Sequence, residues 1–256
     1  MPRLTFDPTT HTYTLDGQVV PSITQVLREA GLIEATGDER ALTRGSEVHR
    51  FCRLLDEDAL DWADVPEAYA GYVRAWEQFR AAMHLDIEAA EIPVASVLHR
   101  FAGRPDRIGR TPMGKFIVEI KTGRPAPWAA LQTAAQALAE TEQSGEAVMR
   151  RWAVWLKPEG AYSVIPHEDR NDGRLFLCAL ALYQWKAAHG LLHPPAEIMD
   201  PWKEESHGAR TPEPASQPGD PEPDRDGSGE SQSSERDPEN SQGLAPGNQS
   251  SLFSDH

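Results

Sequence analysis

Three charged residues in the stretch GRPDRIGRTPMGKFIVEIKTG, residues 103–123, have types that could act on an anionic substrate. The apolar run 116–118 leads directly to Glu119 and Lys121, and Asp106 lies just upstream. Two carboxyl groups and an ammonium group beside an apolar run are costly to bury unless they bind something. The stretch therefore predicts a binding or catalytic site.

The geometry of a hairpin would bring these side chains together. Thr111-Pro112-Met113-Gly114 has the residues of a type I turn, with proline second and glycine fourth. If Pro112 and Met113 form the loop, Asp106 lies directly opposite Glu119, although a bulge at Gly114 would shift this register by one residue. Glu119 and Lys121 are two residues apart on one strand, so both project from the same face.

Two carboxylates this close repel each other, and one of them would take up a proton unless a cation lies between them. A hard divalent ion such as Mg²⁺ or Mn²⁺ fits, because it prefers oxygen ligands. The lysine can orient or deprotonate a water molecule, or stabilise charge that develops on a phosphate. This combination predicts phosphodiester hydrolysis. The alternative is a surface ion pair of Glu119 with Lys121 or Arg107.

The elements that must position these residues follow from periodicity and turn residues. The residues that precede the hairpin predict helices over 43–55 and from Pro66 onward. Strands are expected at 87–96, 99–109, 115–122, around Trp152–Leu156 and at 162–165, and later helices at 127–142 and 175–189. The predicted order α, β, β, β, α, β indicates an α/β (α+β) fold, with a mixed sheet flanked by helices.

The first 40 residues predict an N-terminal elaboration. Alternation around Tyr13, broken by Asp7-Pro8 and Asp16-Gly17, favours a small β-meander. Ser22 followed three residues later by Gln25 is typical of a capping box at the start of a helix.

The composition divides the chain into a folded domain, residues 1–200, and a tail, residues 201–256. The tail contains 8 Pro, 6 Gly and 10 Ser among its 56 residues, which predicts disorder because such a segment cannot bury enough apolar surface. Neither a signal peptide nor a membrane-spanning run is recognisable, and the two cysteines are too few for an iron–sulfur cluster. We therefore expect a cytoplasmic protein.

Charge is distributed unevenly. The net charge of −15 argues against a protein that coats nucleic acid non-specifically. Between Arg100 and Arg124, however, seven bases face only two acids, a net of +5. This is either a solvated basic hairpin or a local positive field for an anionic substrate.

The motifs VPSITQVL, GSEVHRFC, EIPV, GRPDRIG, VEIKTG and LQTAAQALA, within residues 10–190, resemble the PD-(D/E)XK nuclease superfamily. They are most similar to its RecB-type exonuclease branch, which includes phage exonucleases and the mitochondrial genome-maintenance exonuclease. The resemblance implies a restriction-endonuclease-like core. It also implies a metal held by Asp106, Glu119, the Ile120 carbonyl and His49, with Lys121 as the catalytic lysine.

The same resemblance suggests further site residues. Gln132 matches a glutamine that contacts the site from the following helix, whereas Gln136 stands where the family has tyrosine, so its role is open. Trp128, Gln132 and Gln136 would share one helix face. The alternative is that this face is a polar stripe in contact with solvent. For Glu91, one interpretation is a role in binding metal or orienting DNA. The alternative is a plain strand carboxylate. By their charge alone, Arg104 and Arg107 are candidates to grip phosphates; the alternative is that they face solvent and neutralise the site.

The chain ends with NQSSLFSDH, in which Gln249, Leu252 and Phe253 resemble the peptide that docks on the bacterial sliding clamp. A short apolar anchor at the end of a polar tail suits such docking. Chance similarity is the alternative.

Together these features predict a Mg²⁺- or Mn²⁺-dependent DNA nuclease, an exonuclease working from ends or on single strands. One alternative is an endonuclease of the same superfamily. The other is a non-catalytic nucleic-acid-binding module, which the presence of Asp106, Glu119 and Lys121 disfavours.

Overall fold

The computed structural model describes residues 3–33 and 38–193. All described residues belong to a single compact unit. The predicted tail and its terminal peptide lie outside the described residues. Within the described part, no helix is long and apolar enough to cross a membrane.

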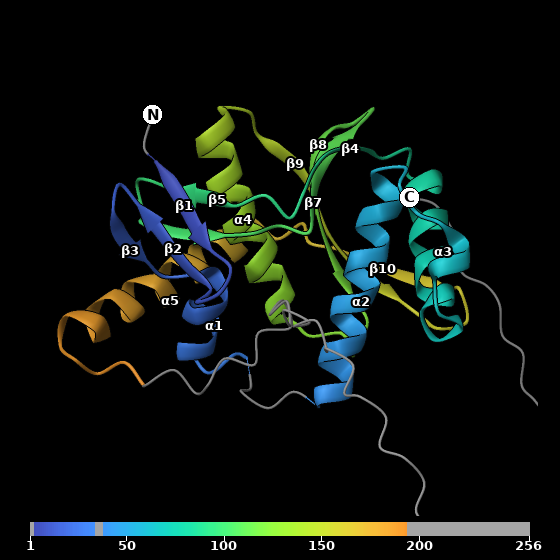
Figure 1. Ribbon diagram of the computed structural model, residues 1–256. Coiled ribbons are helices and arrows are strands. Elements are labelled where there is room, and N and C mark those ends of the chain that lie inside the picture. Colours follow the sequence, from blue (N-terminus) through green and yellow to red (C-terminus); the bar gives the residue numbers. More distant parts are fainter. Residues whose placement is uncertain (1–2, 34–37, 194–256) are drawn as a thin grey trace, which may run out of the picture. The chain divides into compact units, whose positions relative to one another are not determined.

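A five-stranded mixed sheet forms the centre, in the order β10-β9-β8-β7-β4 (Figure 1). β8 and β9 are parallel, and the other neighbours are antiparallel. The mixed sheet predicted from the sequence is confirmed. Its strands are β4 (Asp86–Ala90), β7 (Arg107–Thr111), β8 (Gly114–Lys121), β9 (Val148–Leu156) and β10 (Tyr162–Pro166).

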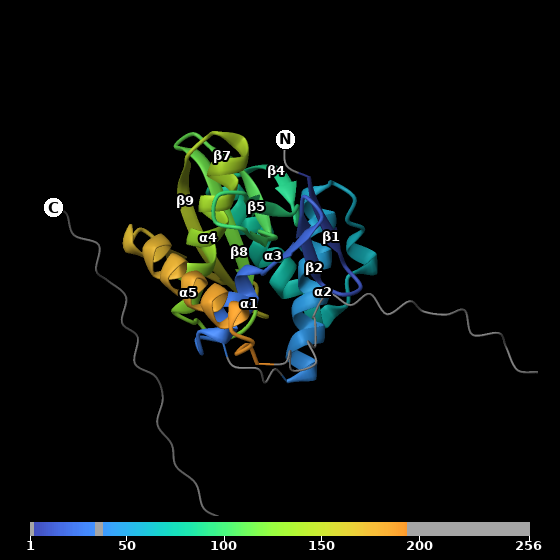
Figure 2. The same cartoon turned by 90° about the vertical axis from the view of Figure 1, so that its left-hand side faces the viewer.

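Helices cover both faces of this sheet because successive side chains of the buried strand β8 point to opposite sides. Phe116, Val118 and Ile120 pack against α2 (Glu39–Asp56) and α3 (Glu67–Ala82). Ile117 packs on the other side, in a cluster that includes residues of α1 (Ile23–Glu29), α4 (Trp128–Ser144) and α5 (Asn171–Ala188). Figure 2 shows α1, α4 and α5 gathered on this side.

The β-meander and the capping box predicted near the N-terminus are both present. β1 (Leu4–Asp7), β2 (Thr12–Leu15) and β3 (Gln18–Val20) form a three-stranded antiparallel sheet. The Ser22 side chain accepts from the Gln25 amide, and the Gln25 side chain accepts from the Ser22 amide, so the capping box is present.

Two predicted strands are each divided. The segment expected at 87–96 forms β4 and β5 (Val94–Ser96), and the segment expected at 99–109 forms β6 (Phe101–Gly103) and β7. β5 and β6 pair in a separate two-stranded sheet. Glu91 has a left-handed φ of 54°, and Pro93 and Pro105 have no N–H to donate to a ladder. The chain therefore leaves the central sheet at these positions.

Helix boundaries also differ from the sequence-based expectations. α2 begins at Glu39 rather than 43, and α5 at Asn171 rather than 175. Pro66 is the N-cap of α3 rather than its first residue. The short 3₁₀ helix η1 (Trp62–Asp64) precedes it.

Candidate active site at the open edge of β8

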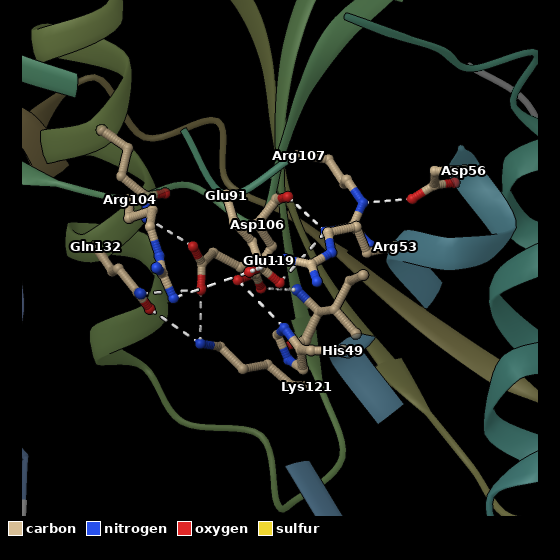
Figure 3. A network of polar contacts seen from close by, with 12 residues as sticks. His49, Arg53, Asp56, Glu91, Arg104, Asp106, Arg107, Glu119, Lys121 and Gln132 are labelled. Atoms are coloured by element: carbon tan, nitrogen blue, oxygen red, sulfur yellow. Dashed lines mark hydrogen bonds and ion pairs between the residues drawn. The ribbon is translucent and has the colours of Figure 1, made fainter. Parts of the chain in front are cut away.

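The predicted register of the hairpin is confirmed. β7 pairs with β8 from Thr111↔Gly114 to Arg107↔Val118, without a shift at Gly114. Continued by one residue, this register sets Asp106 opposite Glu119, and the two carboxyl groups lie next to each other in Figure 3. Asp106 and Glu119 are both buried, with 5% and 2% of their surface exposed. The carboxylates therefore project together into a shielded space.

β8 continues beyond the start of β7, so its last residues have no strand partner on that side. Two side chains take the place of the absent strand. The Ile120 amide donates to Asp106 Oδ2 at 2.7 Å, and the Ile120 carbonyl O lies 3.0 Å from His49 Nε2. The edge of β8 is thus satisfied by a carboxylate and an imidazole rather than by backbone groups.

Both oxygens of Glu119 are held by hydrogen bonds. Oε2 accepts from Lys121 Nζ at 2.8 Å and from Gln132 Nε2 at 2.9 Å, and Oε1 accepts from Gln136 Nε2 at 2.6 Å. Lys121 also donates to Gln132 Oε1 at 3.1 Å and lies 5.2 Å from the ring centre of Trp128. One face of α4 therefore fixes the orientation of the Glu119 carboxylate.

The two carboxyl groups have pKa values shifted in opposite directions. Burial, followed by the negative charge of Asp106, raises the pKa of Glu119. For Asp106 the effect of burial is outweighed by the charge and hydrogen bond of His49, by Lys121 and by the Ile120 amide, which lower its pKa to about 2. Asp106 is therefore the carboxylate that stays ionised most readily.

Lys121 remains an ammonium group. Burial lowers the pKa of Lys121, but the nearby charges of Glu119 and Asp106 outweigh burial and raise it. A proton donor, not a free amine, therefore stands beside the carboxylates at neutral pH.

The donor set at this edge fits a hard divalent cation. Asp106 and the Ile120 carbonyl supply oxygens, and His49 Nδ1 lies 3.4 Å from Asp106 Oδ1. The 3.0 Å separation of His49 Nε2 and the Ile120 oxygen is also that of neighbouring ligands on an octahedral ion with bonds of about 2.1 Å. Among residues 3–33 and 38–193, no three His, Cys, Asp or Glu side chains are already gathered as a ligand cluster.

Glu91 lies behind the carboxylates among three arginines (Figure 3). Its carboxylate is 3.6 Å from Arg53, 3.8 Å from Arg104 and 4.0 Å from Arg107. Arg104 also stacks over Phe6 of β1, 5.1 Å from the ring centre. Glu91 is thus a buried, ion-paired carboxylate with 7% of its side chain exposed, and it lies just after the end of β4.

The expectation for Arg107 was wrong in both of its forms. Its side chain is 0% exposed, pairs with Asp56 of α2 and donates to the Asp106 carbonyl at 2.6 Å. A fully buried guanidinium cannot grip a phosphate or neutralise the site from solvent.

The net positive charge of residues 100–124 is also largely compensated by acids from distant segments. Arg110 pairs with Glu88 and Glu146, and Lys115 with Glu140. The local excess of bases in the sequence therefore does not translate into an equal positive field around the site.

Sequence reasoning left two contributors unassigned. Gln136 is 1% exposed and bonds to Glu119, so it does not belong to a solvated stripe. Its four-residue spacing from Gln132 was a sufficient signal, but the difference from the family pattern argued against it. Asp56, two turns after His49 on α2, had no signal of its own because its partner lies far along the chain.

Comparisons with known proteins give no assignment at the level of sequence. No family model matches the chain, and no curated protein matches it. Among solved structures, the chain is similar to a protein from Eubacterium rectale that is provisionally described as an exonuclease. The identity is 15%, the TM-score is 0.44, and 68% of this chain and 83% of that one are covered.

The chain is also similar to LHK-Exo, an alkaline exonuclease from Laribacter hongkongensis. Its complex with dAMP matches with 15% identity and a TM-score of 0.31, covering 67% of this chain and 94% of that one. A second structure of LHK-Exo has 14% identity and a TM-score of 0.28, with 65% and 93% covered. Identities and TM-scores this low are insufficient to assign a family or an activity.

Proposed function

We propose that the protein is a divalent-metal-dependent nuclease that hydrolyses phosphodiester bonds in DNA. One observation carries the proposal: Asp106 and Glu119 are buried together where β8 has an open edge, with the Lys121 ammonium 2.8 Å from Glu119. Such a group of charges is costly in a purely structural role. This arrangement suits a site where a bound cation neutralises the carboxylates and a bound phosphate neutralises the lysine.

Asp106, Glu119, the Ile120 carbonyl and His49 would hold Mg²⁺ or Mn²⁺. When bound, such an ion supplies Lewis-acid stabilisation of phosphate oxygens and a more acidic water molecule. The protein's contribution is the fixed placement of the donors. Asp106 is held by the Ile120 amide, and Glu119 is held by Gln132 and Gln136.

Lys121 acts as a hydrogen-bond donor in this proposal. Because its raised pKa keeps it protonated, it donates to the attacking water or to a phosphate oxygen, and it stabilises negative charge that develops there. Gln132 keeps the ammonium in place by accepting its second hydrogen bond.

We further propose an exonuclease that works from DNA ends or on single strands. Arg104 is the arginine that reaches the substrate phosphate, with Glu91 holding its guanidinium. Gln249, Leu252 and Phe253 would dock the enzyme on a bacterial sliding clamp.

A cleavage assay on single-stranded, blunt linear and circular DNA, with Mg²⁺ and with EDTA, tests the activity. We expect shortening of linear DNA that EDTA abolishes, and no cleavage of circles. Cleavage of circular DNA would identify an endonuclease. Binding of DNA without cleavage in any metal would identify a non-catalytic module.

Substitutions in the site test the assignment of residues. Lys121→Ala and Asp106→Ala should each reduce the cleavage rate at least about 100-fold, because Lys121 stabilises negative charge in the transition state and Asp106 would hold the metal ion that does the same. Circular dichroism should show that both variants remain folded. Cleavage at the wild-type rate by either variant would contradict the proposed mechanism.

A further inference from the structure

Asp56 and Arg107 form a buried pair directly beside the candidate metal ligands. Their side chains are 2% and 0% exposed. Asp56 also accepts from Trp76 Nε1 at 2.9 Å and from Arg80 Nη1 at 3.1 Å. The Asp56 carboxylate therefore ties α2, α3 and the start of β7 together at one point.

Arg107 connects this point to the site. Its Nη1 donates to the Asp106 carbonyl oxygen at 2.6 Å, and that oxygen also accepts from the Glu91 amide at 3.1 Å. The guanidinium lies 5.7 Å from the ring centre of Trp76. The backbone of Asp106 is thus fixed by the side chain of the residue that follows it.

The helix that carries Asp56 also carries His49. Seven residues, or about two turns, separate them, so both lie on one side of α2. His49 contacts Asp106 and the Ile120 carbonyl, whereas Asp56 contacts Arg107. α2 therefore contacts the β7–β8 edge at two places, through His49 and through Asp56 (Figure 3).

Fold stability alone is a poor explanation for this pair. A buried ion pair often contributes no more than apolar residues of the same volume, because both charges must be desolvated. Its geometry is more specific than that of an apolar contact, since a guanidinium donates in fixed directions. Such a pair suits a role in setting the position of one element against another.

We propose that Asp56 and Arg107 are positioning residues, which set the register of α2 along the edge of β8 and thereby hold His49 at Asp106 and Ile120. This inference rests on the proposed metal-dependent function. It assigns to Arg107 a role behind the metal ligands instead of contact with substrate.

The test is the affinity of the full-length protein for Mn²⁺, measured by titration with electron paramagnetic resonance and without DNA. Asp56→Asn and Arg107→Lys should each weaken Mn²⁺ binding by about 10- to 100-fold, as is usual when groups that orient metal ligands are altered. Both substitutions keep the volume of the side chain nearly unchanged, and thermal unfolding in EDTA reports how much stability each one costs.

Lys115 and Glu140 provide a matched control. They form a second buried pair, between β8 and α4, 2.6 Å apart and 6% and 8% exposed, but at the other end of β8. Glu140→Gln should lower thermal stability while leaving Mn²⁺ affinity at the wild-type value. Equal losses of Mn²⁺ affinity in Glu140→Gln and Asp56→Asn would overturn the inference, because they would reflect general loosening.

A double variant tests whether Asp56 acts through His49. In a His49→Ala background, Asp56→Asn should cause no further loss of Mn²⁺ affinity, since residues that act through one another are not additive. Additive losses, or wild-type affinity in Asp56→Asn, would overturn the positioning role while the metal site stands. Absence of Mn²⁺ binding by the wild-type protein would overturn the nuclease proposal, and this inference with it.

Discussion

At the scale of single residues, Glu119 shows how one carboxylate is adjusted by its surroundings. Burial and the charge of Asp106 raise its pKa, although Lys121 and Gln136 work in the opposite direction. In the absence of a cation, ionised Glu119 is therefore less favourable in the folded protein than in the unfolded chain.

This shift predicts a pH dependence of stability in EDTA. A carboxyl group with a raised pKa contributes to the free energy of unfolding. This contribution is complete below the ordinary pKa of 4.5 and is lost as pH rises through the raised pKa. The neutral variant Glu119→Gln lacks this loss. As pH rises from about 4 through the raised pKa, the melting temperature of the variant should rise relative to that of the wild type.

Thermal unfolding of both proteins across this pH range is the measurement. Adding Mn²⁺ should stabilise the wild type more than the variant, because only the wild type keeps the full ligand set. A variant that loses stability relative to the wild type as pH rises would show that Lys121 stabilises the ionised carboxylate more than burial penalises it.

Gln136 gives a second prediction for a single residue. It donates to Glu119 Oε1 at 2.6 Å from a position one turn beyond Gln132. Gln136→Ala should lower kcat by about 10-fold with little change in KM for DNA, because it loosens Glu119 without touching the substrate. Gln143→Ala is the control on the same helix, since the Gln143 side chain contacts the Ala95 amide instead. Equal kcat values in both variants would contradict the role of Gln136.

At the scale of elements, the packing of helices against the sheet decides where a glycine is required. Gly71 of α3 approaches the β9–β10 connection so closely that an added Cβ would lie 1.6 Å from the Pro158 carbonyl oxygen. Gly45 of α2 has no atom nearer than Thr122 Oγ1, at 4.0 Å from such a Cβ. Both are interior helix positions with opposite steric surroundings.

Alanine substitutions should therefore have opposite effects on stability. Gly45→Ala should increase the free energy of unfolding by about 0.5–1 kcal/mol, because alanine favours the helix. Gly71→Ala should decrease it by about 2 kcal/mol, because displacing backbone outweighs the same gain. Urea denaturation of both variants measures this, and a stabilised Gly71→Ala would mean that α3 lies farther from β9 and β10.

At the scale of the whole molecule, the acidic tail and the candidate site lie in different parts of the chain. From Pro201 onward there are 12 acids and 4 bases, so 28 acids and 21 bases remain in the first 200 residues. The described contacts of the candidate site involve residues from Phe6 to Gln136. We therefore expect catalysis to be independent of the tail.

A chain that ends at Ser206 should cleave DNA and unfold like the full-length protein. It should fail to bind a bacterial sliding clamp, and full-length Phe253→Ala should fail in the same way, because the apolar anchor is lost. A pull-down with the clamp and a cleavage assay measure the two properties. Equal clamp binding by wild type and Phe253→Ala would exclude the docking role.

The sequence by itself determined the local features of this protein. The turn residues 111–114 predicted the hairpin register, which sets Asp106 opposite Glu119, and the two-residue spacing of Glu119 and Lys121 predicted their shared face. These features depend on residues close together in the chain, so periodicity and turn chemistry are enough to predict them. The capping box at Ser22 was predictable for the same reason.

Only the tertiary structure decided how distant side chains meet at the open edge of β8. In the sequence, Arg107 is one of several bases in a hairpin, and Gln136 is part of a polar helix stripe. In the structure, α2 places Asp56 beside Arg107, and α4 places Gln136 against Glu119. Such contacts depend on how helices pack against the sheet, which brings together residues far apart in the sequence. Burial then changes the roles expected of these side chains from contact with solvent or substrate to contact with the protein. A charged group removed from water is stable only with a partner in the protein.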